Sequence, residues 1–506
     1  MAIEPGPDPL MALELGPASL PASADAIVVG AGAAGCVVAA RLAAEGRSVV
    51  VVEAGPGPPR PASVLGHDPV AAASTPGWTW SDLEARARPD GPAAPYRQGR
   101  GIGGGSAING LILAPGDRAD YRAWASVVGP AWGPDAMAPW LDAAAAAFQP
   151  ISIPAGPVTG PFLEALAAGG HGPVVGDSLE PDRNGVMAAS LALVDGRRVS
   201  AADRFLAPAM AGGAVRLIAN APVDHIRTTG GDRSTAAGVA LVDGRAIDAP
   251  LVVSCAGAIG SPALLRRSGL AGPSVGRRLI DHPSVALTLR LTPEVADRDR
   301  LGLASHVLRW SPDRDGADQP AGSDAPGADA GGDLQAFVLD RVDDGGAGAE
   351  PLAVVAIGLL APTSIGRLGA DGQPITAALS TETDRVRFRA GVRHLLDRCH
   401  DRSMAGVVSA VLADDRGTPA SALAELGDTD LDRWLLANPG PYAHPTGTCP
   451  LGPVVSSDPA DGGRLVDRNG VHVIDASVLP GPLRAGPWLT VTAVADRLGT
   501  ALARLG

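Results

Sequence analysis

Three glycines and one carboxylate near the start of the sequence have the types and spacing needed to bind a dinucleotide. Gly30, Gly32 and Gly35 form a GxGxxG pattern, and Glu53 follows at the spacing expected for an acid that binds a ribose hydroxyl. The glycines permit a tight turn and a close approach of backbone to a pyrophosphate. The acid disfavours a 2′-phosphate and therefore NADP, whereas FAD and NAD both stay open. The residues expected to contact the dinucleotide here are Gly30, Gly32, Ala33, Ala34, Gly35, Glu53 and Ala54.

The pattern has the structural context that a dinucleotide site requires. Residues 26–29 are an apolar run typical of a buried strand, residues 36–45 are typical of a helix, and residues 48–52 form a second apolar run that ends at Glu53. This order predicts a βαβ unit. A glycine-rich turn without a ligand is the alternative, but strand, loop, helix and acid all agree with binding.

A second glycine-rich loop, residues 100–110, reads RGIGGGSAING and resembles the RG-x-LGG-x-S-x-x-N-G segment of the glucose–methanol–choline (GMC) oxidoreductases. The resemblance implies that this loop runs along the pyrophosphate and isoalloxazine of FAD. Ile108 stands where some members attach FAD covalently through a histidine, so we predict non-covalent FAD. A plain surface loop is the alternative. The residues implied as cofactor contacts are Arg100, Gly104, Ser106, Asn109 and Gly110.

Further segments resemble the same family in the same order along the chain. They are residues 254–262 (SCAGAIGSP), 275–283 (VGRRLIDHP), 443–452 (AHPTGTCPLG) and 470–480 (GVHVIDASVLP). An ordered set that spans residues 26 to about 500 is far more specific than any one motif. The additional residues that the resemblance implies as FAD contacts are Val223, Ala256, Asp475 and Ala476.

His444 is the predicted catalytic base. Alcohol oxidation needs a group that accepts the hydroxyl proton, and a neutral imidazole suits this task. The family places a histidine at the flavin's re face, and His444 matches it; a structural histidine before Pro445 is the alternative. We interpret His282 as mainly structural and His472 as a solvent-facing strand residue. The remaining histidines and the cysteines have no ligand spacing, so no metal site is predicted.

Arg484 is the predicted second catalytic residue. The family usually places a histidine or asparagine after the DASV-x-P segment, but residues 481–490 (GPLRAGPWLT) contain neither. Arg484 falls in or beside that slot, where a guanidinium can bind an anionic substrate or stabilise an alkoxide or the reduced flavin. A surface arginine before a helix is an equally open interpretation.

Composition limits the partners. The chain has 506 residues and a net charge of −13, which argues against nucleic acid as a partner. The amino-terminal residues are acidic and Pro-rich, unlike a signal peptide. No apolar run reaches the length of a membrane span. We expect a cytoplasmic protein, with peripheral contact to the inner face of the membrane left open.

The predicted fold is α/β, with a Rossmann-like FAD-binding domain and an α+β substrate domain that contains an antiparallel sheet. We assign residues 25–155, 200–280 and 441–506 to the FAD-binding domain and residues 156–199 and 281–440 to the substrate domain. Residues 1–24 are expected to be disordered, and residues 312–348 are expected to form a flexible loop. Residues 352–361 are interpreted as a buried strand.

The predicted function is that of an FAD-dependent dehydrogenase acting on the CH–OH group of an alcohol-like donor, with hydride transfer to flavin N5. We expect a quinone or another respiratory carrier as electron acceptor. The R-x-GP-x-x-T pattern at residues 484–490 resembles the GMC subgroup associated with mycofactocin, which implies reoxidation of reduced mycofactocin. The alternatives are a GMC oxidase that uses oxygen, an FAD-containing hydroxynitrile lyase without redox turnover, and a flavin-binding protein without turnover.

Overall fold

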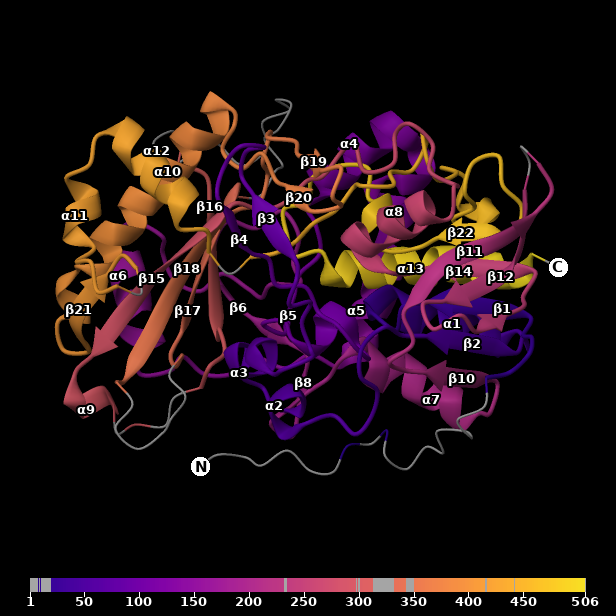
Figure 1. The fold of residues 1–506 in the computed structure, drawn as a ribbon. Helices are drawn as coiled ribbons and strands as arrows, with labels where there is room; N and C mark the ends of the chain where they lie inside the picture. The colour runs from indigo at the N-terminus through magenta and orange to yellow at the C-terminus, as the bar shows by residue number, and fades with distance from the viewer. Residues whose placement is uncertain are drawn as a thin grey trace.

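The computed structural model shows a parallel sheet covered by helices beside a larger antiparallel sheet, with connecting segments between them (Figure 1). It describes residues 8, 10, 20–231, 234–296, 298, 301–312, 332–342, 350–414, 416–440 and 442–505. This mixed architecture is the predicted α/β fold with an additional antiparallel sheet. The assignment of residue ranges to two domains stays a prediction.

The parallel sheet has five strands drawn from distant parts of the sequence. In spatial order they are β10 (Val215–Ile218), β2 (Val49–Val52), β1 (Ala26–Val29), β14 (Leu251–Ser254) and β22 (Val471–Val473). Strands β1, β2 and β14 are buried along their whole length, which explains their unbroken apolar sequences, since a parallel sheet is covered on both faces. The predicted βαβ unit is therefore present, although its helix α1 (Ala33–Ala44) begins earlier than the sequence predicted.

Helix α13 (Trp488–Arg504) packs along α1, and α5 (Pro134–Phe148) packs against α13. Figure 1 shows α13 in yellow beside the indigo α1, so the two ends of the sequence meet over one sheet. Arg41 of α1 donates from Nη2 to Oδ2 of Asp496 in α13 at 2.8 Å. A three-stranded antiparallel sheet, β11 (Val223–Thr229), β12 (Thr235–Leu241) and β13 (Ala246–Ile247), extends from the same region.

The antiparallel sheet has six strands. In spatial order they are β21 (Val408–Leu412), β15 (Ser284–Leu291), β18 (Leu352–Leu359), β17 (Leu334–Leu339), β16 (His306–Trp310) and β6 (Gly185–Ala188). Helices α6 (Thr159–Ala168), α10 (Glu382–Cys399) and α12 (Asp428–Ala437) share a buried apolar cluster with the sheet. The expected buried strand at residues 352–361 is confirmed as β18.

Strand β17 lies inside the segment that was predicted to be a flexible loop. All six of its residues pair with β18, and its first four also pair with β16 on the other side. The polar, loop-like composition of the preceding residues therefore ends before Leu334. Residues 313–331 and 343–348 of the predicted loop lie outside the described residues.

The predicted disordered amino terminus also contains two described, buried residues. The carboxylate of Asp8 accepts from Nη2 of Arg60 at 2.8 Å, and Leu10 is fully buried. An ion pair and an apolar contact therefore tie this part of residues 1–24 to the folded protein. Residues 1–7, 9 and 11–19 lie outside the described residues.

Short strands connect the two large sheets. Strands β3 (Glu84–Arg86) and β4 (Ala93–Pro95) form a small sheet with β19 (Arg367–Leu368) and β20 (Pro374–Ile375). Within the described ranges, no helix combines the length and the apolar character that crossing a bilayer requires.

Candidate active site

A cavity of about 1500 Å³ lies between the carboxyl ends of the parallel strands and the face of the antiparallel sheet. Its wall includes Val29 and Val52 from the first sheet and Phe337 and Ala356 from the second. Ligands of parallel α/β sheets bind outside the carboxyl ends of the strands, so the position is the expected one. The volume exceeds the roughly 300–1000 Å³ of an ordinary small-molecule pocket, which leaves space for a dinucleotide and a second molecule.

The structure brings most of the predicted cofactor residues to this cavity. Gly35 and Arg100 are the exceptions. A Cβ on Gly35 would lie 1.9 Å from the carbonyl oxygen of Gly30, so Gly35 serves close packing of helix on strand. The predicted residues that line the cavity are Gly30, Gly32, Ala33, Ala34, Glu53, Ala54, Gly104, Ser106, Asn109, Gly110, Val223, Ala256, Asp475 and Ala476.

The amino terminus of α1 is suited to a pyrophosphate. Its N-cap residue is Gly32, and no side chain caps the helix, so the first N–H groups and the positive end of the helix dipole face the cavity. A Cβ on Gly32 would meet nothing within 4 Å, whereas a Cβ on Gly104 would lie 2.8 Å from the Cα of Gly32. Glycine at position 104 therefore lets the two loops approach each other beside the open space.

Glu53 holds three loops together at the end of β2. Its buried carboxylate accepts from the backbone N–H groups of Ala31 and Gly55, both at 2.7 Å, and of Gly101 at 3.0 Å. A carboxylate has about four acceptor positions, so one remains for a ribose hydroxyl. The predicted ribose contact fits this geometry, and the sequence did not reveal the additional role in loop closure.

Other predicted contacts fix the glycine loops through their side chains. Oγ of Ser106 donates to the carbonyl of Gly103 at 2.6 Å, and Oδ1 of Asn109 accepts from Nη1 of Arg198 at 2.9 Å. Oδ2 of Asp475 accepts from the backbone N–H of Gly257 at 2.9 Å. These bonds set the loop conformations, so backbone groups form much of the surface that a cofactor meets.

Arg100 acts on the outside of the same loop. Its Nη2 donates to the carbonyl of Ala54 at 2.8 Å, and its guanidinium lies 5.4 Å from the centre of the Trp80 ring. The side chain therefore joins the loop to the end of β2 without lining the cavity.

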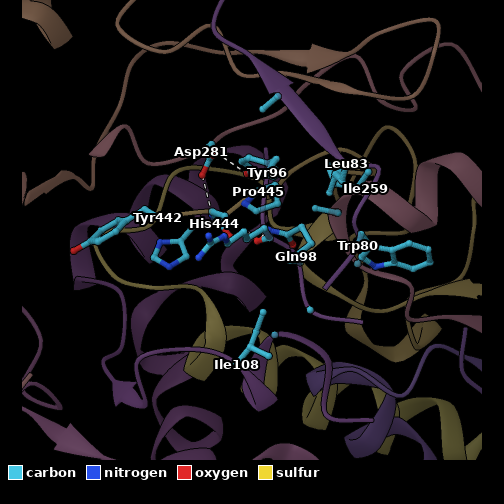
Figure 2. A pocket seen from close by; sticks show the side chains of 18 of the residues that line it. Trp80, Leu83, Tyr96, Gln98, Ile108, Ile259, Asp281, Tyr442, His444 and Pro445 are labelled. Carbon is cyan, nitrogen blue, oxygen red and sulfur yellow. Dashed lines mark hydrogen bonds between the residues drawn. The ribbon is translucent and has the colours of Figure 1, made fainter. Parts of the chain in front are cut away.

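His444, the predicted catalytic base, lies in the cavity wall (Figure 2). Burial lowers the pKa of His444 to about 4, so the imidazole is neutral at physiological pH and can accept a proton. Its Nδ1 lies 3.0 Å from Nδ1 of His282, and the two rings are nearly perpendicular at 89°. The ring of Tyr442 packs against His444 with the centroids 5.0 Å apart.

Asp281 anchors this histidine pair. Its Oδ1 accepts from the backbone N–H groups of His282 and His444, both at 2.8 Å, and its Oδ2 accepts from the Tyr96 hydroxyl at 2.6 Å. Figure 2 shows the bonds from Asp281 to Tyr96 and to His444 above the cavity. Burial raises the pKa of Asp281 to about 6 against the effect of these three donors. Sequence reasoning missed Asp281 as a site residue, although it stands beside His282 in a recognised motif.

Arg484 does not reach His444. Its Nη1 donates to Oδ1 of Asp120 at 2.5 Å, and its Nε donates to Oδ1 of Asp333 at 3.3 Å. Gly486 faces the histidine instead, because a Cβ there would lie 3.6 Å from Cε1 of His444. The position beside His444 is therefore that of Gly486, two residues after Arg484, and it holds no side chain. Arg484 forms a charge cluster away from the cavity lining and is not brought together with the predicted base.

The interpretation of His472 as solvent-facing is wrong. It lies in β22 and is 4% exposed, and its Nδ1 donates to the carbonyl of Gly462 at 2.8 Å. Strand β22 is the edge of the parallel sheet, but the turn at Gly462 covers it. No group of three or more His, Cys, Asp or Glu side chains among the described residues is arranged to hold a metal ion.

Comparison with known proteins identifies the family. The GMC oxidoreductase family models match residues 24–284 and 364–495, which contain the glycine loops, Asp281 and His444. The chain belongs to the GMC oxidoreductase family. It is accordingly an FAD-dependent oxidoreductase, and the resemblance read from the ordered motifs is confirmed.

Relatives match along nearly the whole chain. A GMC-type oxidoreductase of Rhodococcus erythropolis, itself uncharacterized, is 29% identical over 95% of this chain and 98% of its own length. Pyridoxine 4-oxidase of Microbacterium luteolum is 26% identical over 94% and 99% of the two chains. Among solved structures, pyridoxine 4-oxidase from "Mesorbium loti" matches with a TM-score of 0.73 and 24% identity over 94% and 98%. A variant of formate oxidase of Aspergillus oryzae matches with a TM-score of 0.77 and 19% identity over 96% and 99%.

Proposed function

We propose that this GMC oxidoreductase oxidises the CH–OH group of a small alcohol and that His444 accepts the hydroxyl proton. The observation that carries the proposal is a half-buried, neutral imidazole in the wall of the cavity that the glycine loops also line. FAD supplies the hydride acceptor when it is bound. The protein contributes the proton acceptor, the orientation of the donor and a cavity that excludes bulk water.

The cavity lining supports a donor with an apolar, flat body. Trp80, Leu83, Tyr96 and Phe337 contribute apolar or aromatic surface, and the carboxylate of Asp281 is already engaged by three donors. Because the Asp281 carboxylate is already engaged and not free to pair with a cation, such a wall favours an uncharged aromatic or alkyl alcohol over a quaternary ammonium ion. The match to proteins named pyridoxine 4-oxidase supports a hydroxymethyl group on an aromatic ring as the first class to test.

Reduced mycofactocin is a second donor to test, on the strength of the R-x-GP-x-x-T segment at residues 484–490. We propose a quinone or another respiratory carrier as acceptor, and a quinone would bring the protein to the inner face of the membrane. Oxygen is the competing acceptor, because relatives are named oxidases and oxygen-dependent dehydrogenases. Oxygen uptake during turnover decides between the two.

We further propose that FAD is held without a covalent bond. Ile108 lies in the cavity wall and offers only hydrocarbon where some family members provide a histidine. Acid precipitation should therefore release all flavin into the supernatant. Flavin that stays with the precipitated protein would contradict this proposal.

The proposed function is tested by anaerobic reduction of the purified yellow protein. Benzyl alcohol, pyridoxine, choline and reduced mycofactocin are mixed with the protein separately, and flavin absorbance is followed. His444→Asn should keep the bound FAD and slow reduction by roughly 10²–10⁴-fold, the usual contribution of a general base. His472→Asn is the matched control, since it replaces a buried histidine outside the cavity.

Three results would overturn the proposal. A protein that cannot be reconstituted with FAD has no flavin chemistry. Failure of every donor to bleach the flavin would favour a hydroxynitrile lyase or a flavin-binding protein without turnover. Reduction of His444→Asn at the wild-type rate would remove the histidine from the role of base.

A further inference from the structure

The contact between His282 and His444 constrains the protonation of both rings. Their Nδ1 atoms are 3.0 Å apart, so one must donate and the other must accept. Burial lowers the pKa of His282 to about 3 and that of His444 to about 4, and each ring therefore carries one proton at neutral pH. Only two arrangements of these protons satisfy the contact.

The surroundings of His282 select one arrangement. The backbone carbonyls of Leu483 and Leu360 lie near its ring and favour a ring N–H on that side, which raises its pKa against the larger effect of burial. Since Nδ1 of His282 faces His444, Nε2 is the nitrogen that carries a proton towards these carbonyls. A neutral ring protonated at Nε2 has a lone pair at Nδ1. His282 therefore accepts, and His444 donates from Nδ1.

The same arrangement leaves Nε2 of His444 with a free lone pair on the cavity side. A Cβ on Gly486 would lie 3.6 Å from Cε1 and 3.8 Å from Nε2 of His444, and Gly486 lines the cavity. The edge of the ring that carries Nε2 thus borders the open position where other family members place a side chain.

We propose that His282 is a positioning residue that holds His444 in the Nδ1–H tautomer, so that Nε2 of His444 accepts the donor's hydroxyl proton. The proposal rests on the proposed function and explains how this site works with glycine at position 486. In the proton-transfer step the O–H bond breaks, its electron pair stays on oxygen, and the proton forms an N–H bond at Nε2. The hydrogen bond from Nδ1 of His444 to His282 stabilises the resulting imidazolium and orients the ring, as the second partner of a histidine base does in other enzymes.

The tautomers can be read directly by NMR. The FAD-loaded protein is labelled with ¹⁵N-histidine, two-bond ¹H–¹⁵N correlations are recorded at neutral pH, and signals are assigned by their loss in His444→Asn and His282→Asn. The wild type should show His444 protonated at Nδ1 and His282 protonated at Nε2. The opposite assignment for either ring would overturn the proposal.

Two substitutions at position 282 separate positioning from packing. His282→Leu removes the acceptor, and His444 should change to the Nε2–H tautomer. His282→Asn presents an amide oxygen near the position of Nδ1, and His444 should keep its wild-type tautomer. His394→Leu is the matched control, because it breaks another histidine pair, with Nε2 of His171 at 2.8 Å, whose members do not line the cavity. An unchanged His444 tautomer in His282→Leu refutes the proposal; if that variant does not fold, the wild-type and His282→Asn spectra decide.

A kinetic measurement distinguishes this proposal from the proposed function. With pyridoxine or benzyl alcohol, His282→Leu should lower the limiting rate of flavin reduction by roughly 10²–10⁴-fold with little change in KM, and His282→Asn should restore most of it. If the tautomers are as expected but His444→Asn is reduced normally, the proposed function fails and the positioning stands. If His444→Asn is slow but His282→Leu keeps the wild-type rate and tautomer, only the positioning fails.

Discussion

Replacing Tyr96 by Phe tests whether Asp281 is ionised inside the folded protein at neutral and higher pH. The Tyr96 hydroxyl donates to Asp281 at 2.6 Å, and burial raises the pKa of Asp281 to about 6. At about pH 8.5 the carboxylate is charged, and a hydrogen bond to a charged group contributes about 1.5–3 kcal/mol. At about pH 5 the carboxyl is protonated, and a bond between neutral groups contributes about 0.5–1.5 kcal/mol.

The sign of the pH dependence follows from proton binding. The lost hydrogen bond stabilises the charged carboxylate more than the neutral carboxyl. Its loss therefore raises the pKa of Asp281 in the folded variant, by about one unit for the difference between the two hydrogen-bond energies. At a pH between the Asp281 pKa of the wild type and that of the variant, the folded variant holds more protons than the folded wild type. The difference between their free energies of unfolding therefore becomes smaller as the pH falls. With an unfolding entropy of about 2.1 cal/mol/K per residue, 1 kcal/mol corresponds to roughly 1 °C for a chain of 506 residues. We expect melting temperatures lower by about 1.5–3 °C at pH 8.5 and by about 1 °C at pH 5.

Differential scanning calorimetry of the FAD-loaded proteins at one scan rate measures the difference in melting temperature between wild type and Tyr96→Phe at each pH. Tyr442→Phe is the control, because the Tyr442 hydroxyl accepts from the neutral amide of Gln335 at 3.1 Å and its loss should cost the same at both pH values. If Tyr96→Phe lowers the melting temperature equally at the two pH values, the assignment of an ionised Asp281 is refuted.

Three further results are expected. Gly32→Val should abolish flavin absorbance with little loss of stability, because a Cβ at position 32 meets only open cavity; Gly427→Val, at the N-cap of α12 and equally unobstructed, should keep its flavin. When the pH is lowered from about 7.5 to about 5, the free energy of unfolding measured in urea should fall by about 2 kcal/mol more for the wild type than for His472→Leu. The reason is that the unfolded histidine gains a proton near pH 6.5 whereas burial lowers the folded pKa to about 4. Arg484→Met should cost about 3–5 kcal/mol in calorimetry by leaving Asp120 buried without its partner, and less when combined with Asp120→Asn.

The parts of the site that local sequence determines were predictable. A strand, a glycine turn and a helix follow one another without interruption at residues 26–44, so their pattern predicted both the βαβ fold and the position of Gly32 at the start of the helix. His444 was identified because it opens a motif that matches a family with known chemistry. In both cases the informative residues are close neighbours in sequence.

The parts that depend on distant contacts were not predictable. His282 and His444 are 162 positions apart, and nothing in either motif shows that their rings touch. Arg484 lay in the right segment, but only the packing of that loop shows that its guanidinium turns to Asp120 and that Gly486 faces His444. His472 stands between two apolar residues of a strand, the pattern of a residue on a solvent-facing side. Its burial depends on the turn at Gly462, which precedes it in sequence.

The interleaved order of the parallel sheet has a consequence for biosynthesis. Helix α1 ends at Ala44, and its packing partner α13 begins at Trp488. At a translation rate of about 5–20 residues per second, the ribosome needs roughly 20–90 s to make the intervening chain. During that interval the apolar side of α1 and the edge of β14 lack the partners that cover them, so the nascent chain is exposed to aggregation and to chaperones. The parallel sheet and its covering helices, although their synthesis begins first, are therefore among the last parts of the protein to be completed.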